Sequence, residues 1–107
     1  RDYQREVFSV LLLDSKHQLL SYHELFQGSI NETSVHPREV VKLALGKNAA
    51  AVIVAHNHPS GVADPSSSDI AITHKLRSAL GLIDIPLLDH FIIGRGEITS
   101  LAEQGKM

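Results

Sequence analysis

The segment that most constrains the fold is residues 49–69, where an apolar run leads through two histidines into a loop and a helix start. Residues 49–55 (AAAVIVA) are continuously apolar and have the length of a buried strand. The following His-Asn-His-Pro-Ser-Gly segment, residues 56–61, carries loop residues, and Ser66 and Asp69 have the spacing of a helix capping box. A buried strand followed by a loop and a helix is typical of α/β domains.

The patterns on both sides of this segment extend it to the element order β-β-α-β-α-β-β. Strands are expected at residues 7–14, 19–26, 49–55, 87–93 and 97–101, and helices at 37–45, with Gly46 as the stop, and 67–80, with Gly81 as the C-cap. Residues 28–35 are expected to be irregular or a short further strand. The sequence therefore predicts a single α/β domain in which helices pack on a mixed sheet in three layers.

Composition excludes several classes of function. The chain of 107 residues is long enough for one hydrophobic core. It has no cysteine, which removes thiolate zinc sites, cysteine catalysis and the Cys-containing signature of zinc deaminases. No apolar run approaches the ~20 residues of a membrane span, and no leader pattern is present, so we expect a cytoplasmic protein. A net charge of −2 gives no electrostatic footprint for nucleic acid.

His56, His58 and Asp69 have the composition of a zinc site. Residues two apart on an extended segment point to the same side, so both imidazoles are expected to face Asp69 at the helix start. Three such ligands leave the fourth tetrahedral position open for water, as in catalytic zinc sites. The alternatives are histidines bonded to the backbone, and Ser66 and Asp69 acting only as a helix cap.

Motifs along almost the whole chain resemble a known family. The spacing H-x-H-P-S-G followed by S-x-x-D resembles the JAMM motif of MPN-type metallopeptidases. The wider context resembles the C-terminal domain of the bacterial RadC family, on the segments EVFSVLLLD (6–14), LFQGS (25–29), HPREVV (36–41), AHNHPSG (55–61) and LLDHFIIG (87–94). The resemblance implies a cytidine-deaminase-like α/β architecture and a single Zn²⁺ per chain held by His56, His58 and Asp69.

The resemblance also implies the catalytic groups of a zinc-dependent metallopeptidase or isopeptidase. Glu6 lies in E-x-x-S-x-L, similar to E-x-x-G-x-L in JAMM proteins, with Ser9 where those proteins usually have Gly. Glu6 would serve as the general base and Ser66 would help to hold the oxyanion. Glu24 and Glu39 are rival candidates for the base, and a solvated glutamate at a strand start is the simpler interpretation of Glu6.

A second function remains open, because the family name carries a link to DNA repair. In that case the domain would be a DNA-processing accessory with a non-catalytic zinc; an open three-ligand site favours the enzyme instead. We expect a peptide or protein substrate, with no nucleic acid or membrane as a partner of this domain alone. Substrate choice would lie in loops 28–35 and 57–65. The chain starts without Met, and family members commonly carry a preceding helical region, so we expect a fragment of a longer protein.

Two further residues of the motif segments have no assigned chemistry. Asn57, between the two histidines, is expected to face away from them and to order the loop through a hydrogen bond. His90 is interpreted as a core residue with a satisfied ring, in preference to a partner of a metal ligand.

Overall fold

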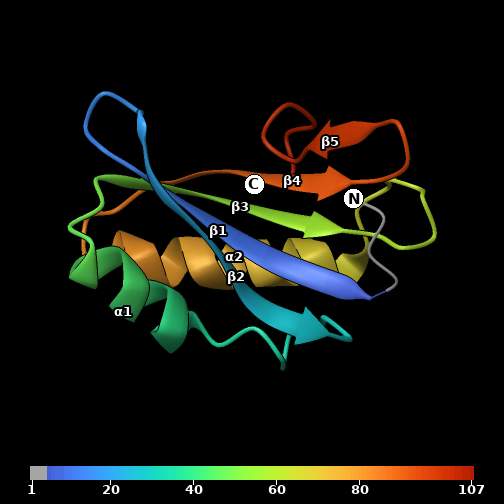
Figure 1. Cartoon of the computed structure of the whole chain (residues 1–107), viewed down its shortest axis with the longest axis horizontal. Coiled ribbons are helices and arrows are strands. Elements are labelled where there is room, and N and C mark those ends of the chain that lie inside the picture. Colours follow the sequence, from blue (N-terminus) through green and yellow to red (C-terminus); the bar gives the residue numbers. More distant parts are fainter. Residues whose placement is uncertain (1–4) are drawn as a thin grey trace.

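The computed structural model describes residues 5–107 and follows the predicted element order (Figure 1). The strands are β1 (Glu6–Leu13), β2 (Leu19–Gly28), β3 (Ala51–Asn57), β4 (Leu87–Ile93) and β5 (Ile98–Ser100), and the helices are α1 (Pro37–Gly46) and α2 (Ser67–Gly81). Residues 28–35 form no third strand of their own. Instead β2 extends to Gly28, and Ile30 and Val35 bury their side chains in the core.

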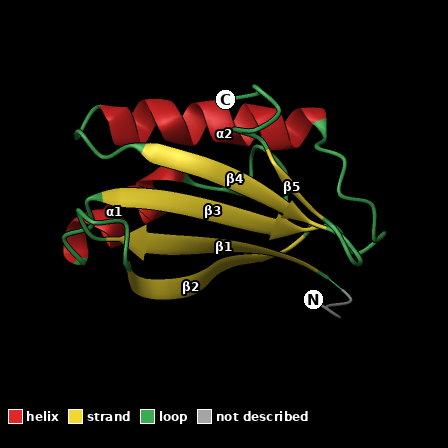
Figure 2. Ribbon diagram, turned by 90° about the horizontal axis from the view of Figure 1, so that it is seen from above, coloured by secondary structure: helices red, strands yellow, loops and turns green. Residues whose placement is uncertain are grey.

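The five strands form one mixed sheet in the order β2-β1-β3-β4-β5 (Figure 2). β1 pairs antiparallel with both β2 and β3, as expected for a central strand joined to β2 in a hairpin. β3 pairs in parallel with β4, and α2 makes the connection between them. The predicted α/β class with a mixed sheet is confirmed.

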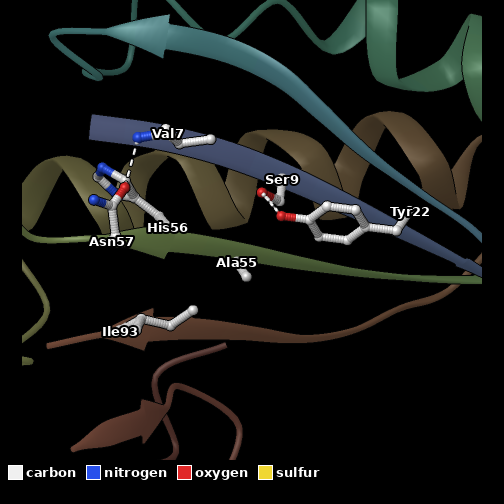
Figure 3. A pocket seen from close by; sticks show the side chains of 7 residues that line it. All are labelled: Val7, Ser9, Tyr22, Ala55, His56, Asn57 and Ile93. Atoms are coloured by element: carbon white, nitrogen blue, oxygen red, sulfur yellow. Dashed lines mark hydrogen bonds between the residues drawn. The ribbon is translucent and has the colours of Figure 1, made fainter. Parts of the chain in front are cut away.

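Both helices cover the same face of the sheet. The β1 side chains Phe8, Val10 and Leu12 are fully buried in one core with Val40 and Ala44 of α1 and Ile72, Leu76 and Leu80 of α2. The alternate β1 residues, such as Ser9, point to the opposite face (Figure 3). Both helices of residues 5–107 pack in the core on the other side of the sheet, so this face is helix-free. The described residues thus supply two of the predicted layers, the sheet and one helical layer.

The helix ends follow local chemistry, with small departures from expectation. Pro37 begins α1 as predicted, because its fixed φ and missing N–H suit the first turn. α2 includes Gly81 and is capped by Leu82, whereas the sequence predicted Gly81 as the cap. Leu45, near the end of α1, is exposed. None of the helices in residues 5–107 is long and apolar enough to cross a membrane.

Candidate metal centre

The predicted ligands converge at the carboxyl end of β3. His56 lies on β3, His58 follows directly after the strand, and Asp69 lies in the first turn of α2. One oxygen of Asp69 lies 2.9 Å from His56 Nδ1, and the other lies 2.9 Å from His58 Nε2. One donor atom from each of the three residues lies within 4.8 Å of the others, so the group could hold a metal ion.

The cluster is screened from solvent on the helical side of the sheet. The side chains of His56 and Asp69 are 2% and 1% exposed, and that of His58 is 17% exposed. The two imidazole rings lie edge to face with centroids 5.1 Å apart, which agrees with the expected placement on one side of the strand. His56 pairs with Phe8 across β1 and β3, on the face that the helices cover.

Hydrogen bonds on the far side of each ring fix which nitrogen faces Asp69. His58 Nδ1 lies 3.0 Å from the carbonyl oxygen of Val62, which can only accept, so Nδ1 carries the proton. His56 Nε2 lies 2.8 Å from Glu6 Oε1 and donates to that carboxylate. A bound ion would take the place of the protons that His58 Nε2 and His56 Nδ1 share with Asp69, so these are the nitrogens available to an ion beside this carboxylate.

Asp69 acts as a helix cap and as part of the cluster at the same time. Asp69 N donates to Ser66 Oγ at 3.0 Å, and Ser66 N donates to Asp69 Oδ2 at 2.8 Å, which completes the predicted capping box. Burial by itself would raise the pKa of Asp69. Hydrogen bonds from His56 and Ser66 and the charge of His56 outweigh burial and hold this pKa well below its ordinary value of 3.8.

The donor set of the cluster suits zinc, and its groups lie close enough together to hold an ion after they move apart. Zinc bonds of ~2.0–2.2 Å at tetrahedral angles would place neighbouring donor atoms ~3.4 Å apart. The two Asp69–histidine separations of 2.9 Å involve different carboxylate oxygens and are shorter than this value, so the groups would have to move apart to admit an ion. Two imidazole nitrogens and a carboxylate are also donors that zinc accepts.

The structure separates the candidate bases clearly. The Glu6 carboxylate points into the cluster. Glu24 lies directly opposite Ser9 on the neighbouring strand, so its side chain is on the helix-free face, where it accepts a hydrogen bond from Tyr22 at 3.2 Å. Glu39, on α1, lies 3.8 Å from the charged groups of Arg38 and Lys42. Of these three carboxylates, Glu6 is the one that contacts a predicted metal ligand.

The loop after His58 is held in place by the turn between β4 and β5. Arg95 N donates to the carbonyl oxygen of Gly61 at 2.8 Å, and Ala63 N donates to Glu97 Oε2 at 3.1 Å. A Cβ at Gly94 would lie 2.5 Å from the same Gly61 oxygen, so this position requires glycine. The contacts fix Val62, whose carbonyl orients the His58 ring.

An open cleft of ≈ 280 Å³ borders the cluster on the side of Glu6. It is lined by Arg5, Glu6, Gly28, Ser29 and Pro59. Ser29 and Pro59 belong to the two loops from which the sequence predicted substrate contacts. A second hollow of ≈ 210 Å³ lies around Ser9, Tyr22 and Ala55 (Figure 3). It lies on the helix-free face and includes His56 in its lining.

His90 lies behind the cluster as a fully buried core residue. Its ring stacks on His56 with centroids 6.4 Å apart, and its Nδ1 lies 2.6 Å from Thr73 Oγ1. Thr73 in turn donates to the carbonyl oxygen of Asp69 at 2.7 Å. The interpretation of His90 as a core residue is confirmed, but only one of its two ring nitrogens is hydrogen-bonded, because Nε2 has no hydrogen-bond partner among residues 5–107. Sequence reasoning missed Thr73, and its spacing of one helical turn from Asp69 was the available signal.

Acid should destabilise the metal-free protein through His90. Burial lowers the pKa of His90 from its ordinary value of 6.5 to about 4. Between these values the unfolded chain binds a proton that the folded protein does not, so stability falls as the pH is lowered from 6.5 to 4. We expect a loss on the order of 3 kcal/mol, measured by urea unfolding in the presence of chelator.

The matched variant for this prediction is His90→Leu, which removes the titrating ring and keeps an apolar side chain. Its unfolding free energy should vary less with pH across the same window, whatever its absolute stability. The lowered pKa of Asp69 contributes separately, because that stability is present above pH 3.8 and is lost only below it. Equal pH dependence of wild type and His90→Leu between pH 6.5 and 4 would contradict the role of His90.

Comparison with known proteins agrees with the motif pattern. The profile of a family described as "RadC-like JAB domain" matches residues 1–106. Proteins named "UPF0758 protein" are similar to the chain: one from Halorhodospira halophila is 60% identical over 105 residues, and one from Cellvibrio japonicus is 61% identical over 105 residues. Each match covers 98% of this chain and 47% of the relative.

The chain therefore spans about half the length of the curated relatives that it matches. The family profile covers nearly the whole chain, and one of the segments that suggested the RadC resemblance carries both histidines of the observed cluster. This chain belongs to the RadC-like JAB domain family.

Proposed function

We propose that this domain is a zinc-dependent hydrolase that cleaves amide bonds in a peptide, protein or isopeptide substrate. The observation that carries the proposal is the contact of Glu6 with the buried histidine–aspartate cluster. A carboxylate that lies beside three potential ligands, without being one of them, is what a metal-dependent hydrolase needs as a base. Membership in a JAB domain family supports the same class of chemistry.

The residues divide the chemistry among them. His56, His58 and Asp69 would hold the ion, which would lower the pKa of a coordinated water and polarise the substrate carbonyl. Glu6 would take the proton from the attacking water and deliver it to the leaving amine. Val62 and the Glu6 carboxylate would keep the imidazoles oriented through their outer nitrogens.

Ser66 would donate to the oxyanion that forms at the carbonyl carbon. Its Oγ accepts from Asp69 N at 3.0 Å, which leaves the hydroxyl proton available for a further bond. The residue is exposed at the start of α2, where the helix N-terminus also favours negative charge. Capping and oxyanion stabilisation are therefore compatible roles of one hydroxyl.

The cleft beside Glu6 supports an extended substrate. It lies between the beginning of β1, the end of β2 and the loop after His58, so a chain entering it would pass the Glu6 carboxylate. The exposed Arg5 gives this cleft a positive group, which suits a substrate with a carboxylate near the cleaved bond. The net charge of −2 does not suit a polyphosphate partner.

The test is a panel of peptides, isopeptide-linked peptides and oligonucleotides presented to zinc-loaded and chelated protein. We expect chelator-sensitive cleavage of at least one amide or isopeptide and none of the oligonucleotides. Binding to duplex and single-stranded DNA, followed by fluorescence anisotropy at two salt concentrations, should give Kd ~10⁻⁴ M or weaker at physiological salt.

The opposite result would favour the DNA-processing alternative. Each neutralised phosphate contributes ~0.9 to the slope of binding affinity against salt concentration. Sub-micromolar DNA binding with a steep salt slope, together with no cleavage of any amide, would replace the hydrolase proposal with a nucleic-acid function. Because the chain spans about half of its relatives, the same panel is best repeated on a full-length family member.

A further inference from the structure

The strands that carry Glu6 and His56 separate at the candidate site. β1 and β3 pair through Phe8 opposite His56, and that pair is the last in the ladder. Beyond it β3 stays with β4, through Asn57 opposite Ile93 and a bond of 2.9 Å from His58 N to the Ile93 carbonyl oxygen. The main chain around Glu6 therefore loses its β3 partner at the point where Glu6 must be held.

The side chain of Asn57 bridges this gap (Figure 3). Its Oδ1 accepts from Val7 N at 2.6 Å, and its Nδ2 donates to the carbonyl oxygen of Arg5 at 3.1 Å. A backbone N–H can only donate and a carbonyl can only accept, so the two partners fix the orientation of the amide. Both partners belong to the residues that flank Glu6.

We propose that Asn57 is a positioning residue for Glu6. Side chains alternate along β3, so His56 lies on the helical face and Asn57 on the opposite face. Neighbouring residues thus supply a proposed metal ligand and a side chain that holds the β1 main chain. Only 7% of Asn57 is exposed, and both polar groups of its amide are used. By holding the main chain on both sides of Glu6, the amide keeps the carboxylate 2.8 Å from His56 Nε2.

This inference rests on the proposed role of Glu6, but its first test does not need activity. The readout is the Glu6–His56 hydrogen bond in metal-free protein, observed by NMR as a protected His56 Nε2–H signal. In Asn57→Ala we expect this signal to be lost through exchange with water and the Val7 amide to exchange at least ~10-fold faster, since a free-energy change of 1.4 kcal/mol corresponds to a factor of ten.

Two other variants separate positioning from general damage to the sheet. Asn57→Asp has the same shape and can still accept from Val7 N, but it places an oxygen against the Arg5 carbonyl, so we expect an intermediate effect. Ser9→Ala is the matched control, because it removes a hydrogen bond of 3.0 Å to Tyr22 on the helix-free face, where Asn57 also lies, and does not touch Glu6. It should leave both NMR signals unchanged.

The second test uses catalysis and a double-mutant cycle with Glu6→Gln. If Asn57 acts through Glu6, Asn57→Ala should lower kcat by at least ~10-fold in the wild-type background and change little when Glu6 is already Gln. A merely structural role would give the same fold-loss in both backgrounds. Zinc content should fall no further in Asn57→Ala than in Glu6→Ala, because the three ligands are untouched.

The outcomes distinguish this inference from the proposed function. If no amide is ever cleaved but the His56 signal disappears in Asn57→Ala, the positioning role stands and the hydrolase proposal fails. The inference is overturned if the His56 Nε2–H signal survives in a folded Asn57→Ala protein, or if Asn57→Asp behaves as wild type in every measurement. In either case Asn57 would only link β3 to the main chain of β1.

Discussion

Replacing Glu6 with glutamine should leave the zinc in place and lower turnover by about 10²–10⁴-fold, the usual contribution of a general base. Glutamine has the size of glutamate and keeps an oxygen that can accept the 2.8 Å hydrogen bond from His56 Nε2. It cannot accept the proton of the attacking water. The measurements are kcat on the amide found by the substrate panel and zinc content by elemental analysis.

Two further variants give this result its meaning. Glu6→Ala removes the acceptor as well, so it should lose turnover and also bind zinc more weakly, because His56 is no longer oriented. Glu24→Gln changes a carboxylate that accepts from Tyr22 and pairs with Ser9 of the helix-free face, and it should retain turnover. Full activity in Glu6→Gln would place the base elsewhere, and loss of zinc in that variant would make Glu6 a ligand.

His58→Ala should remove most of the bound zinc, which is the second large effect. Three protein ligands come together among residues 5–107, so losing one leaves two of them and a partly open site. The remaining Asp69 carboxylate would also lose its contact of 2.9 Å with His58 Nε2. Zinc per chain after equilibration with a metal buffer is the measurement, with His74→Ala, an exposed histidine on α2, as the control.

Asp69→Asn tests the same site while preserving the helix start. An asparagine oxygen can still accept from Ser66 N, so α2 should keep its cap and the protein should fold. A neutral amide is a poor substitute for the carboxylate beside two imidazoles, so zinc affinity should fall. Full zinc occupancy in both His58→Ala and Asp69→Asn would show that the ion binds at another place.

The sequence predicted the elements and the ligands because their signals are local. The apolar run 49–55, the Pro-Gly loop and the capping-box spacing each report on neighbouring residues, and they place His56 and His58 on one side of a strand facing Asp69. The main differences lie at element ends, such as β3 continuing through Asn57, where hydrogen bonds to β4 decide the last paired residue.

Contacts between distant segments could not be predicted in this way. Glu6 was selected by family resemblance alone, since nothing in its neighbourhood indicates that β1 would place it 2.8 Å from His56. The bond between Thr73 and His90 joins α2 to β4 and depends on how the helix packs on the sheet. The same applies to the two backbone partners of Asn57, which depend on where β1 and β3 separate.

The separation of these partners along the chain has a consequence for the order of assembly. The three ligands lie within one strand–loop–helix unit, with His56 and Asp69 13 positions apart, whereas Glu6 and His56 are 50 positions apart. Closing the shorter loop costs less chain entropy, so a unit of β3 and α2 that formed first would already bring together the three residues proposed to hold the ion. Glu6 arrives only when β1 docks on β3. On the proposed function, metal uptake and completion of the catalytic site would be distinct stages of folding, and bound zinc alone would not report a finished active site.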